Sequence, residues 1–256
     1  MCILFIAVEQ HPDYPLIVAA NRDEFHQRPT QASAFWPEYP DVLAGKDLQA
    51  GGSWMGVSAT GKLAALTNIR APGKEISEAR SRGELVMNFL TDNVGAKEYL
   101  GRLSSSAAEF NGYNLLFGNL DSLQVYNNFD DSVYSLKKGV YGLSNASLNS
   151  PWPKLDLGRS ELVKYCQQST ILNIEHLFDL LGNSTKASDE VLPQTGVPIE
   201  WERKLSSIFI ESPDYGTRSC TVLLMDKHRQ VFWQERSFNP TAKLVDQQTY
   251  MFSLRH

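Results

Sequence analysis

The amino-acid sequence predicts an α+β protein in which antiparallel β-sheets are covered by helices. Two apolar runs rich in β-branched residues, at 2–9 and 16–24, flank the turn-forming segment 10–15 and indicate a buried hairpin. Further along, the patterns come in blocks, in the order strands, helices, strands, helices, strands. A doubly wound parallel sheet would need strands and helices to alternate, so this order favours antiparallel sheets.

The individual elements follow from apolar periodicity and from turn residues. Strands are expected at 41–46, 53–58, 62–68, 113–119, 123–129, 132–136, 140–145, 218–225, 230–235 and 249–254. Helices are expected after a capping box at Ser81–Glu84, and at 95–109, 153–168, 173–182 and 198–210. Residues 27–41 contain three prolines and little periodicity, so we expect a loop there.

Composition limits the classes of protein to which the chain can belong. Of the 256 residues, 42% are hydrophobic and 21% are charged, which is typical of a globular protein with a sizeable core. The net charge of −5 offers no basic surface for nucleic acid. No stretch approaches the roughly 20 apolar residues that cross a bilayer, and the start lacks the basic region of a signal peptide. We expect one cytoplasmic domain over residues 1–256, without a nucleic-acid partner or a membrane span.

Cysteine and histidine usage argues against a structural metal site. The three cysteines, Cys2, Cys166 and Cys220, form no CxxC pair, and their odd number does not suggest a disulfide framework. The five histidines are scattered, without an HxxxH or HxH pair. We therefore expect no protein metal centre of the zinc type.

Cys2 is the first candidate for chemistry. Removal of Met1, which a small second residue normally allows, would leave a thiol and an α-amine on one residue. An α-amine has a pKa of about 7.7–8.0, so it can take the thiol proton as a built-in general base. The alternative is a small buried residue at the start of a core strand, which is the stronger interpretation from position alone.

The tetrapeptide Asn21-Arg22-Asp23-Glu24 ends the second strand of the predicted hairpin. A register that closes across the intervening turn brings it to Cys2, with Asp23 opposite. Arg22 would then stabilise a thiolate and lower the pKa of the cysteine, and Asp23 would hold the α-amine. A solvated, charged strand end is an equally good interpretation of the tetrapeptide.

Three further residues matter in combination. Asn68 and Asn145 each follow an apolar strand, where asparagine is most often a turn residue. If both converge on one sheet edge, their side-chain N–H groups can stabilise an oxyanion. Arg218 opens the penultimate strand pair, and its alternative is an ordinary surface arginine.

An ordered set of motifs resembles the NRDE family of transport and Golgi organisation protein 2-like proteins. The motifs are MC at the start, NRDE at 21–24, GGSWMG at 51–56, KLAALTN at 62–68, SRGELV at 81–86, YGLSN at 141–145 and GTRS at 216–219. That family is similar in plan to the N-terminal nucleophile hydrolases, which include penicillin V acylase and bile salt hydrolase. The resemblance implies an αββα sandwich of two antiparallel sheets. It also implies catalytic positions at Cys2, Arg22, Asp23, Asn68, Asn145 and Arg218.

The family's association with haem trafficking implies a carrier of haem or another small hydrophobic ligand. Haem donor or acceptor proteins would be its partners. The expected ligand-binding residues are Cys2, Asn21, Arg22, Asp23, Glu24, His26 and Arg70. The axial candidates for the haem iron are Cys2, His11 and His26. The propionates could bind Arg22, Arg28, Arg70 or Arg218.

Three alternatives stay open beside the carrier. The same constellation implies an N-terminal cysteine hydrolase that cleaves an amide C–N bond and needs no catalytic cofactor. The family's second association, with acyl-CoA and lipid metabolism, implies an acyl-CoA or lipid-handling protein. A scaffold without a ligand is the third. The chain has no CxxCH motif, so covalent haem attachment is not expected.

Overall fold

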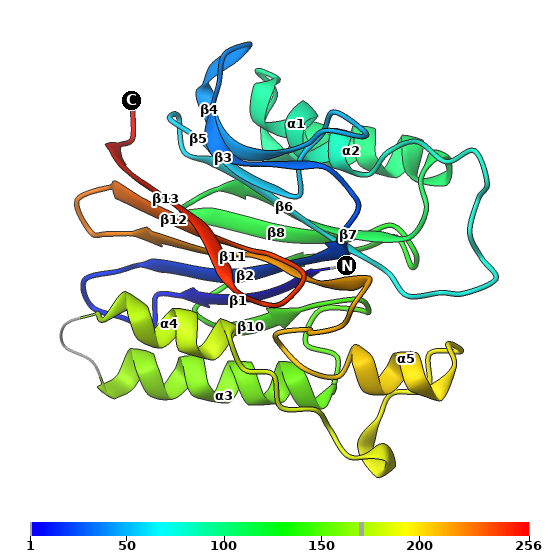
Figure 1. Ribbon diagram of the computed structural model, residues 1–256. Helices are drawn as coiled ribbons and strands as arrows, with labels where there is room; N and C mark the ends of the chain where they lie inside the picture. Colours follow the sequence, from blue (N-terminus) through cyan, green and yellow to red (C-terminus); the bar gives the residue numbers. More distant parts are fainter. Residues whose placement is uncertain (1, 169–171, 256) are drawn as a thin grey trace.

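The computed structural model describes residues 2–168 and 172–255, and it has four layers: helices, sheet, sheet, helices (Figure 1). Both sheets are antiparallel, so the expected αββα sandwich is confirmed. The first sheet has the spatial order β10 (Gly139–Leu143), β1 (Cys2–Val8), β2 (Leu16–Phe25), β11 (Tyr215–Met225), β12 (Gln230–Phe238) and β13 (Leu244–Ser253). The second has the order β3 (Thr30–Trp36), β4 (Tyr39–Asp47), β5 (Met55–Ser58), β6 (Lys62–Asn68), β7 (Tyr113–Asn119), β8 (Ser122–Asn127) and β9 (Ser132–Ser135).

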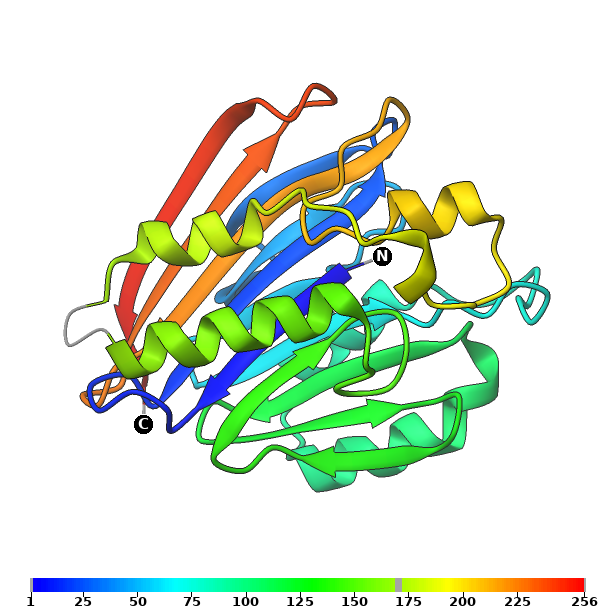
Figure 2. The same ribbon diagram turned by 90° about the horizontal axis from the view of Figure 1, so that it is seen from below.

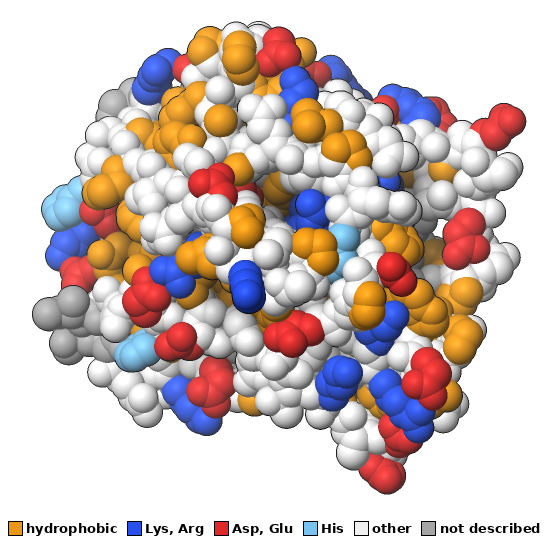
Figure 3. Space-filling model, viewed as in Figure 1, with side chains coloured by type: hydrophobic (Ala, Val, Ile, Leu, Met, Phe, Trp, Pro, Cys, Tyr) orange, Lys and Arg blue, Asp and Glu red, His pale blue; other side chains and the backbone are white. Residues whose placement is uncertain are grey.

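Helices cover the outer face of each sheet. The second sheet is covered by α1 (Gly83–Thr91) and α2 (Ala96–Ser106), and the first by α3 (Pro153–Gln168) and α4 (Ile174–Leu181) (Figures 1 and 2). The short helix α5 (Ile199–Lys204) lies beyond them. Within residues 2–168 and 172–255, no helix combines the length and the apolar character that crossing a bilayer requires. On the face in Figure 3, acidic and basic side chains are interspersed.

The strand β1 is buried on both faces. Leu4 and Ile6 point into the core between the two sheets, whereas Ile3 and Phe5 point into the core beneath α3 and α4. A strand that packs against an apolar core on each face has no side exposed to solvent. This explains why the sequence of β1, CILFIAV, is apolar throughout. The residue at the head of this strand is therefore held by the cores on both sides.

Helix α3 approaches β1 closely through Gly158. A Cβ atom added there would lie 2.1 Å from Cζ of Phe5, so only glycine allows this contact. Figure 2 shows α3 over the sheet that contains β1. The contact fixes α3 against the middle of β1, and the first turn of α3 carries Lys154.

The expected hairpin forms, but its register is shifted by one residue. Cys2 lies opposite Arg22, and Val8 opposite Leu16, so the prediction that paired Cys2 with Asp23 is wrong. Glu9 leaves the ladder with a φ of 52°. Since strand residues alternate between faces, a shift of one residue changes which neighbours face each other across the ladder.

The loop expected at 27–41 is wrong, because β3 and the start of β4 occupy it. Its prolines lie where no ladder hydrogen bond is needed. Pro29 precedes β3, Pro37 lies in the turn after it, and Pro40 lies where the β3–β4 register slips. Proline is tolerated at edges and bulges of sheets, so proline content alone did not exclude strands.

Two helix predictions need correction at their ends. The capping box does not form, since α1 begins at Gly83 and no side chain caps it. The helix expected at 198–210 ends at Lys204. Beyond it, the hydroxyls of Ser206 and Ser207 donate to nearby backbone carbonyls, which competes with continuation of the helix.

Candidate functional site

Cys2 faces a cleft of about 300 Å³, which we call the inner compartment. The cysteine is half-buried at the head of β1, between β10 and β2. The compartment is lined by Cys2, Arg22, Asp23, Glu24, Arg28, Asp47, Ala50, Ser53, Trp54, Leu66, Asn68, Ala79, Arg80, Ser81, Arg82, Gly83 and Asn111. Most of the lining is polar or charged, and Cys2 contributes its single thiol.

Arg22 lies opposite Cys2 and points into the space between the sheets. Its side chain is 4% exposed, and its Nη2 lies 3.5 Å from Oδ2 of Asp47. The guanidinium carbon lies 4.4 Å from the ring centroid of Trp54, which is cation–π geometry. Among the described residues, Nη1 of Arg22 has no hydrogen-bond partner. The arginine is thus held rigidly while one donor is left for a ligand.

Asp23 projects from the opposite face of β2, because neighbouring strand residues alternate. It is buried, and its Oδ1 accepts a 2.7 Å hydrogen bond from Oγ1 of Thr217. Burial raises the pKa of this carboxyl, while the nearby ammonium of Lys154 opposes the shift. Asp23 also lines the inner compartment, so its carboxyl can act on a group at the head of β1.

Lys154 was not anticipated from the sequence. It is buried in the first turn of α3, where its Nζ donates a 3.0 Å hydrogen bond to the carbonyl of Leu205. Burial lowers the pKa of Lys154 to about 8, and Asp23 is the largest influence in the other direction. The available signal was helical spacing: Lys154 shares a face with the buried Gly158 and Leu162.

The pKa of the Cys2 thiol is raised, not lowered. Burial is the largest influence on Cys2 and raises its pKa, and the arginine opposite opposes this only in part. Arg22 therefore lowers the pKa of Cys2 as predicted, but burial outweighs it and the net shift is upward. A thiol of this kind needs a base to remove its proton before it can attack.

Asn68 and Asn145 are in contact, although Asn68 ends a strand of the second sheet and Asn145 follows a strand of the first. Asn68 ends β6 and lines the inner compartment, whereas Asn145 follows β10. Nδ2 of Asn145 donates a 2.9 Å hydrogen bond to the backbone carbonyl of Asn68. The expectation that both converge on one sheet edge is wrong. Asn145 instead fixes the strand end that presents the amide of Asn68.

The other expected residues divide into two groups. Glu24 and Arg28 line the inner compartment. Five lie outside its lining: Arg70, which lines the outer compartment described below, and the four residues Asn21, His11, His26 and Arg218.

Each of these four residues has a structural contact of its own. Nδ2 of Asn21 donates to the carbonyls of Leu181 (2.8 Å) and Ile208 (3.0 Å) in the helical layer. Arg218 lies at a bulge in β11, and its Nη1 donates to backbone carbonyls at the end of β2 and in the segment that follows it.

The two histidines expected as iron ligands lie apart from each other and from the inner compartment. His11 is buried in the β1–β2 turn, at the far end of the hairpin from Cys2, and its Nδ1 accepts a 3.1 Å hydrogen bond from the Asp13 amide. His26 follows β2, with its Nε2 3.0 Å from the carbonyl of Ser212. Of the three expected axial ligands, the structure brings only Cys2 to this cleft.

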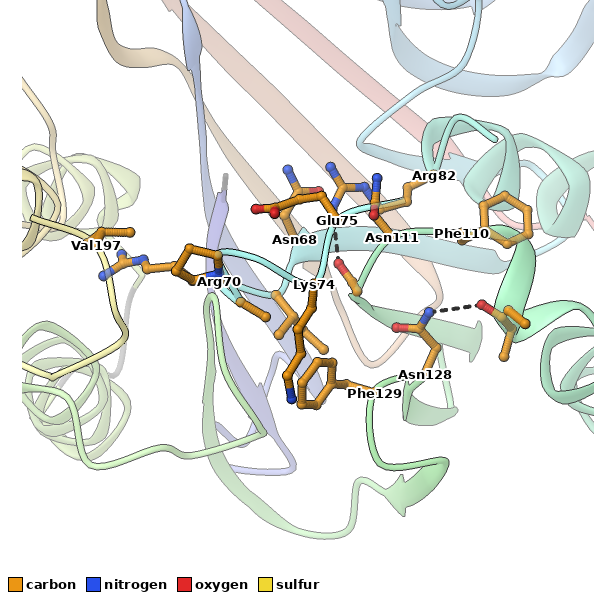
Figure 4. A pocket seen from close by; sticks show the side chains of 16 residues that line it. Asn68, Arg70, Lys74, Glu75, Arg82, Phe110, Asn111, Asn128, Phe129 and Val197 are labelled. Carbon is orange, nitrogen blue, oxygen red and sulfur yellow. Dashed lines mark hydrogen bonds between the residues drawn. The ribbon is translucent and has the colours of Figure 1, made fainter. Parts of the chain in front are cut away.

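A larger outer compartment of about 550 Å³ adjoins the inner one and shares Asn68, Arg82 and Asn111 with it. Its walls are mainly apolar and include Ile69, Ala71, Pro72, Ala107, Ala108, Phe110, Phe129 and Val197. In Figure 4, Asn68, Arg82 and Asn111 bring their polar ends together, whereas Arg70 points toward Val197.

Arg70 is engaged on the far side of the outer compartment. Its Nη1 lies 2.6 Å from Oε2 of Glu202, and the side chains of this ion pair are 5% and 4% exposed. The guanidinium also lies 5.0 Å from the ring centroid of Trp152. Arg70 therefore holds α5 against the body of the protein.

Two of the sequence motifs meet at the inner compartment. A Cβ atom on Gly52 would lie 2.4 Å from the carbonyl carbon of Gly83, and the amide of Ser53 donates to the Gly83 carbonyl at 3.1 Å. The loop that carries Trp54 is therefore locked to the start of α1, which carries Arg82. Both side chains lie within quoted motifs, but their contacts with the site could not be read from the sequence.

Comparisons with known proteins agree with this architecture. The C. elegans N-acylethanolamine-hydrolyzing acid amidase ortholog has a similar structure, with a TM-score of 0.53 and 12% identity over 87% of this chain and 92% of that one. The fold is thus that of the N-terminal nucleophile hydrolases, as expected.

Sequence relatives identify the family. The Transport and Golgi organization 2 homolog of Mus musculus is 34% identical over 100% of both chains. The homolog of Homo sapiens is 36% identical, again over 100% of both. The family model described as Transport and Golgi organisation 2 matches residues 1–240. The chain therefore belongs to the Transport and Golgi organisation 2 family.

Proposed function

We propose that the inner compartment is the site of an N-terminal cysteine hydrolase that cleaves the amide C–N bond of an acyl compound. The observation that carries the proposal is the position of Cys2, which faces the cleft together with Arg22, Asp23 and Asn68. A nucleophile, charged side chains and an amide donor on rigid strands are what acyl transfer requires. The similar fold of an acid amidase is in keeping with this chemistry.

The reaction would begin with Met1 removed. The α-amine of Cys2 takes the proton of the thiol, and the sulfur attacks the amide carbonyl carbon to form a tetrahedral oxyanion. The side-chain amide of Asn68 donates to that oxyanion. When the C–N bond breaks, the α-ammonium gives its proton to the leaving amine. Water then hydrolyses the thioester and restores the thiol.

The surroundings of the thiol support this division of roles. Burial raises the pKa of Cys2, so a nearby base is needed, and an α-amine with a pKa of about 7.7–8.0 suits neutral pH. Asp23, buried beside Thr217, supplies a negative charge that orients the ammonium form. The apolar walls of the outer compartment would accept the acyl chain.

Hydrolysis of N-dodecanoyl amides by the full chain tests the proposal. Wild type should release the amine, and Cys2→Ala should not. Alanine also allows removal of Met1, so this variant keeps the α-amine and isolates the thiol. Cys166→Ala is the matched control, since Cys166 lies on the buried face of α3, in the core between the helices and the first sheet, and its replacement should leave turnover unchanged. Turnover that persists in Cys2→Ala would refute the mechanism.

Carriage of haem or another hydrophobic ligand is the second candidate. The observation that favours it is the outer compartment, whose apolar walls adjoin a thiol and an arginine. Cys2 would be the axial ligand, and Arg22 or Arg82 would bind a propionate. Haem donor and acceptor proteins would be the partners. An acyl-CoA thioester would use the same thiol and the same apolar walls.

A haem titration separates this candidate from the first. A saturable shift of the Soret band should be lost in Cys2→Ala and unchanged in the double variant His11→Ala/His26→Ala, because neither histidine lines the inner compartment. If no shift occurs, or if the histidine variant abolishes it, ligation by Cys2 is excluded.

A further inference from the structure

We infer that Arg82 binds an anionic group of the ligand, so that the cleft selects amphipathic carboxylates over neutral ligands with the same apolar chain. The inference rests on the proposed function only for the location of the ligand. It concerns what the junction between the two compartments recognises, and it holds for a ligand that is carried as well as for one that is cleaved.

The arginines of the inner compartment differ in whether they form ion pairs within the protein. Four arginines line it: Arg22, Arg28, Arg80 and Arg82. The carboxylate of Asp47 lies 2.6 Å from Nε of Arg28 and 3.5 Å from Nη2 of Arg22. Arg80 forms ion pairs with Glu84 and Glu109. Three of the four guanidinium charges therefore have a carboxylate partner in the protein.

Arg82 is different. Within residues 2–168 and 172–255, no carboxylate forms an ion pair with it, and its Nη1 donates a 3.0 Å hydrogen bond to the carbonyl of Gly112. Glu24 exerts an electrostatic influence on it, but that carboxylate lies 4.0 Å from Nε of Arg28. A charge without an ion-pair partner among the described residues is the group to which a ligand anion adds most.

Partial burial of Arg82 is a second reason to expect an anion there. Burial is the largest influence on Arg82 and lowers its pKa, which means that its charge is held at a cost in free energy. A ligand carboxylate at the guanidinium would relieve that cost. A neutral headgroup such as an alcohol would leave the charge as it is, so the difference between the two ligands becomes a difference in affinity.

The position of Arg82 suits a ligand that spans both compartments. It lines both of them, and Figure 4 places its guanidinium beside the amides of Asn68 and Asn111. The close approach of Gly83 to Gly52 fixes its backbone. An anion bound here has Cys2 on one side, across the inner compartment, and the apolar walls of the outer compartment on the other.

The test measures binding with two probes that share the acyl chain and the amide, N-dodecanoylglycine, which ends in a carboxylate, and N-dodecanoylethanolamine, which ends in a neutral hydroxyl. Calorimetric titration of the full chain carrying Cys2→Ala prevents turnover. The anionic probe should bind about tenfold more tightly or better, as expected for a charge-assisted hydrogen bond. Adding Arg82→Gln should abolish the preference, and adding Arg80→Gln, whose guanidinium is exposed and paired, should preserve it.

Arg82→Lys guards against a folding defect in the glutamine variant. It keeps the charge and should keep part of the preference, and thermal unfolding of each variant checks the fold. A preference that survives Arg82→Gln in a folded chain would overturn the inference. Equal binding of the two acyl probes, or binding of neither, would exclude acyl carboxylates and leave the tetrapyrrole pair described next to decide. Failure of wild type to hydrolyse either probe would instead count against the proposed hydrolase alone.

A second pair of probes, both tetrapyrroles, identifies which kind of ligand supplies the carboxylate. Protoporphyrin IX and its dimethyl ester differ in the same way as the acyl probes, and porphyrin fluorescence reports their binding. Selectivity for the free acid that Arg82→Gln removes would show that propionates use this site. Selectivity confined to the acyl pair would assign the site to acyl carboxylates. Selectivity in neither pair would overturn the inference.

Discussion

Thr217 donates a 2.7 Å hydrogen bond from its Oγ1 to Oδ1 of Asp23, and the same hydroxyl accepts a 2.9 Å bond from the amide of Ile210. One side chain of β11 therefore links the carboxyl behind Cys2 to the segment that follows α5. The carboxyl of Asp23 is buried, so its orientation depends on such partners.

Replacing this hydroxyl tests the role of Asp23. Thr217→Val should destabilise the fold by about 1–3 kcal/mol, because it removes the hydroxyl that bonds both the buried carboxyl of Asp23 and the buried amide of Ile210. Amide hydrolysis should fall by about tenfold as the pKa of Asp23 rises further. Thr217→Ser keeps the hydroxyl and should retain both properties. Urea unfolding and an amidase assay check these expectations, and wild-type behaviour of Thr217→Val would contradict them.

Lys154 should make stability depend on alkaline pH. Burial lowers its pKa from 10.5 to about 8, so between these values the unfolded chain holds a proton that the folded chain has lost. Stability must then rise with pH across this window. The free energy of unfolding of wild type, minus that of Lys154→Met, should increase by roughly 2 kcal/mol from about pH 8 to about pH 10. A difference that is constant with pH would show that the ammonium is not perturbed by burial.

The contact of Gly52 with Gly83 should be sensitive to a single methyl group. Gly52→Ala places a Cβ atom 2.4 Å from the Gly83 carbonyl carbon, so the Trp54 loop must separate from α1 at a cost of about 1–3 kcal/mol. Ligand binding should weaken with it, because Arg82 moves. Gly51→Asn is the control, since a Cβ at Gly51 meets nothing within 4 Å and asparagine tolerates its φ of 77°. Equal stability and binding in the two variants would contradict this account.

The parts of the site that were predictable from the sequence lie at strand ends. Cys2, Asp23 and Asn68 terminate apolar runs, and apolar runs fix where strands begin and end. The register of the first hairpin was not predictable, because Glu9 leaves the ladder with a positive φ that glutamate rarely adopts.

The supporting residues were not predictable, because they come from other layers. Lys154 reaches Asp23 through packing of α3 on β1, and Arg82 reaches the cleft through the contact between two glycines. Such pairings depend on tertiary geometry that no local pattern records. Gly52 and Gly83 both lie within the quoted motifs, but the motifs did not indicate that the two residues are in contact.

The central claim is that Cys2, as the N-terminal residue, is acylated by its substrate. Intact-mass measurement of the natively expressed chain, before and after treatment with p-nitrophenyl dodecanoate, tests this most directly. We predict a chain that begins at Cys2 and gains one dodecanoyl group, which Cys2→Ala does not gain. Full retention of Met1, or equal acylation of the Cys2→Ala variant, would contradict the claim.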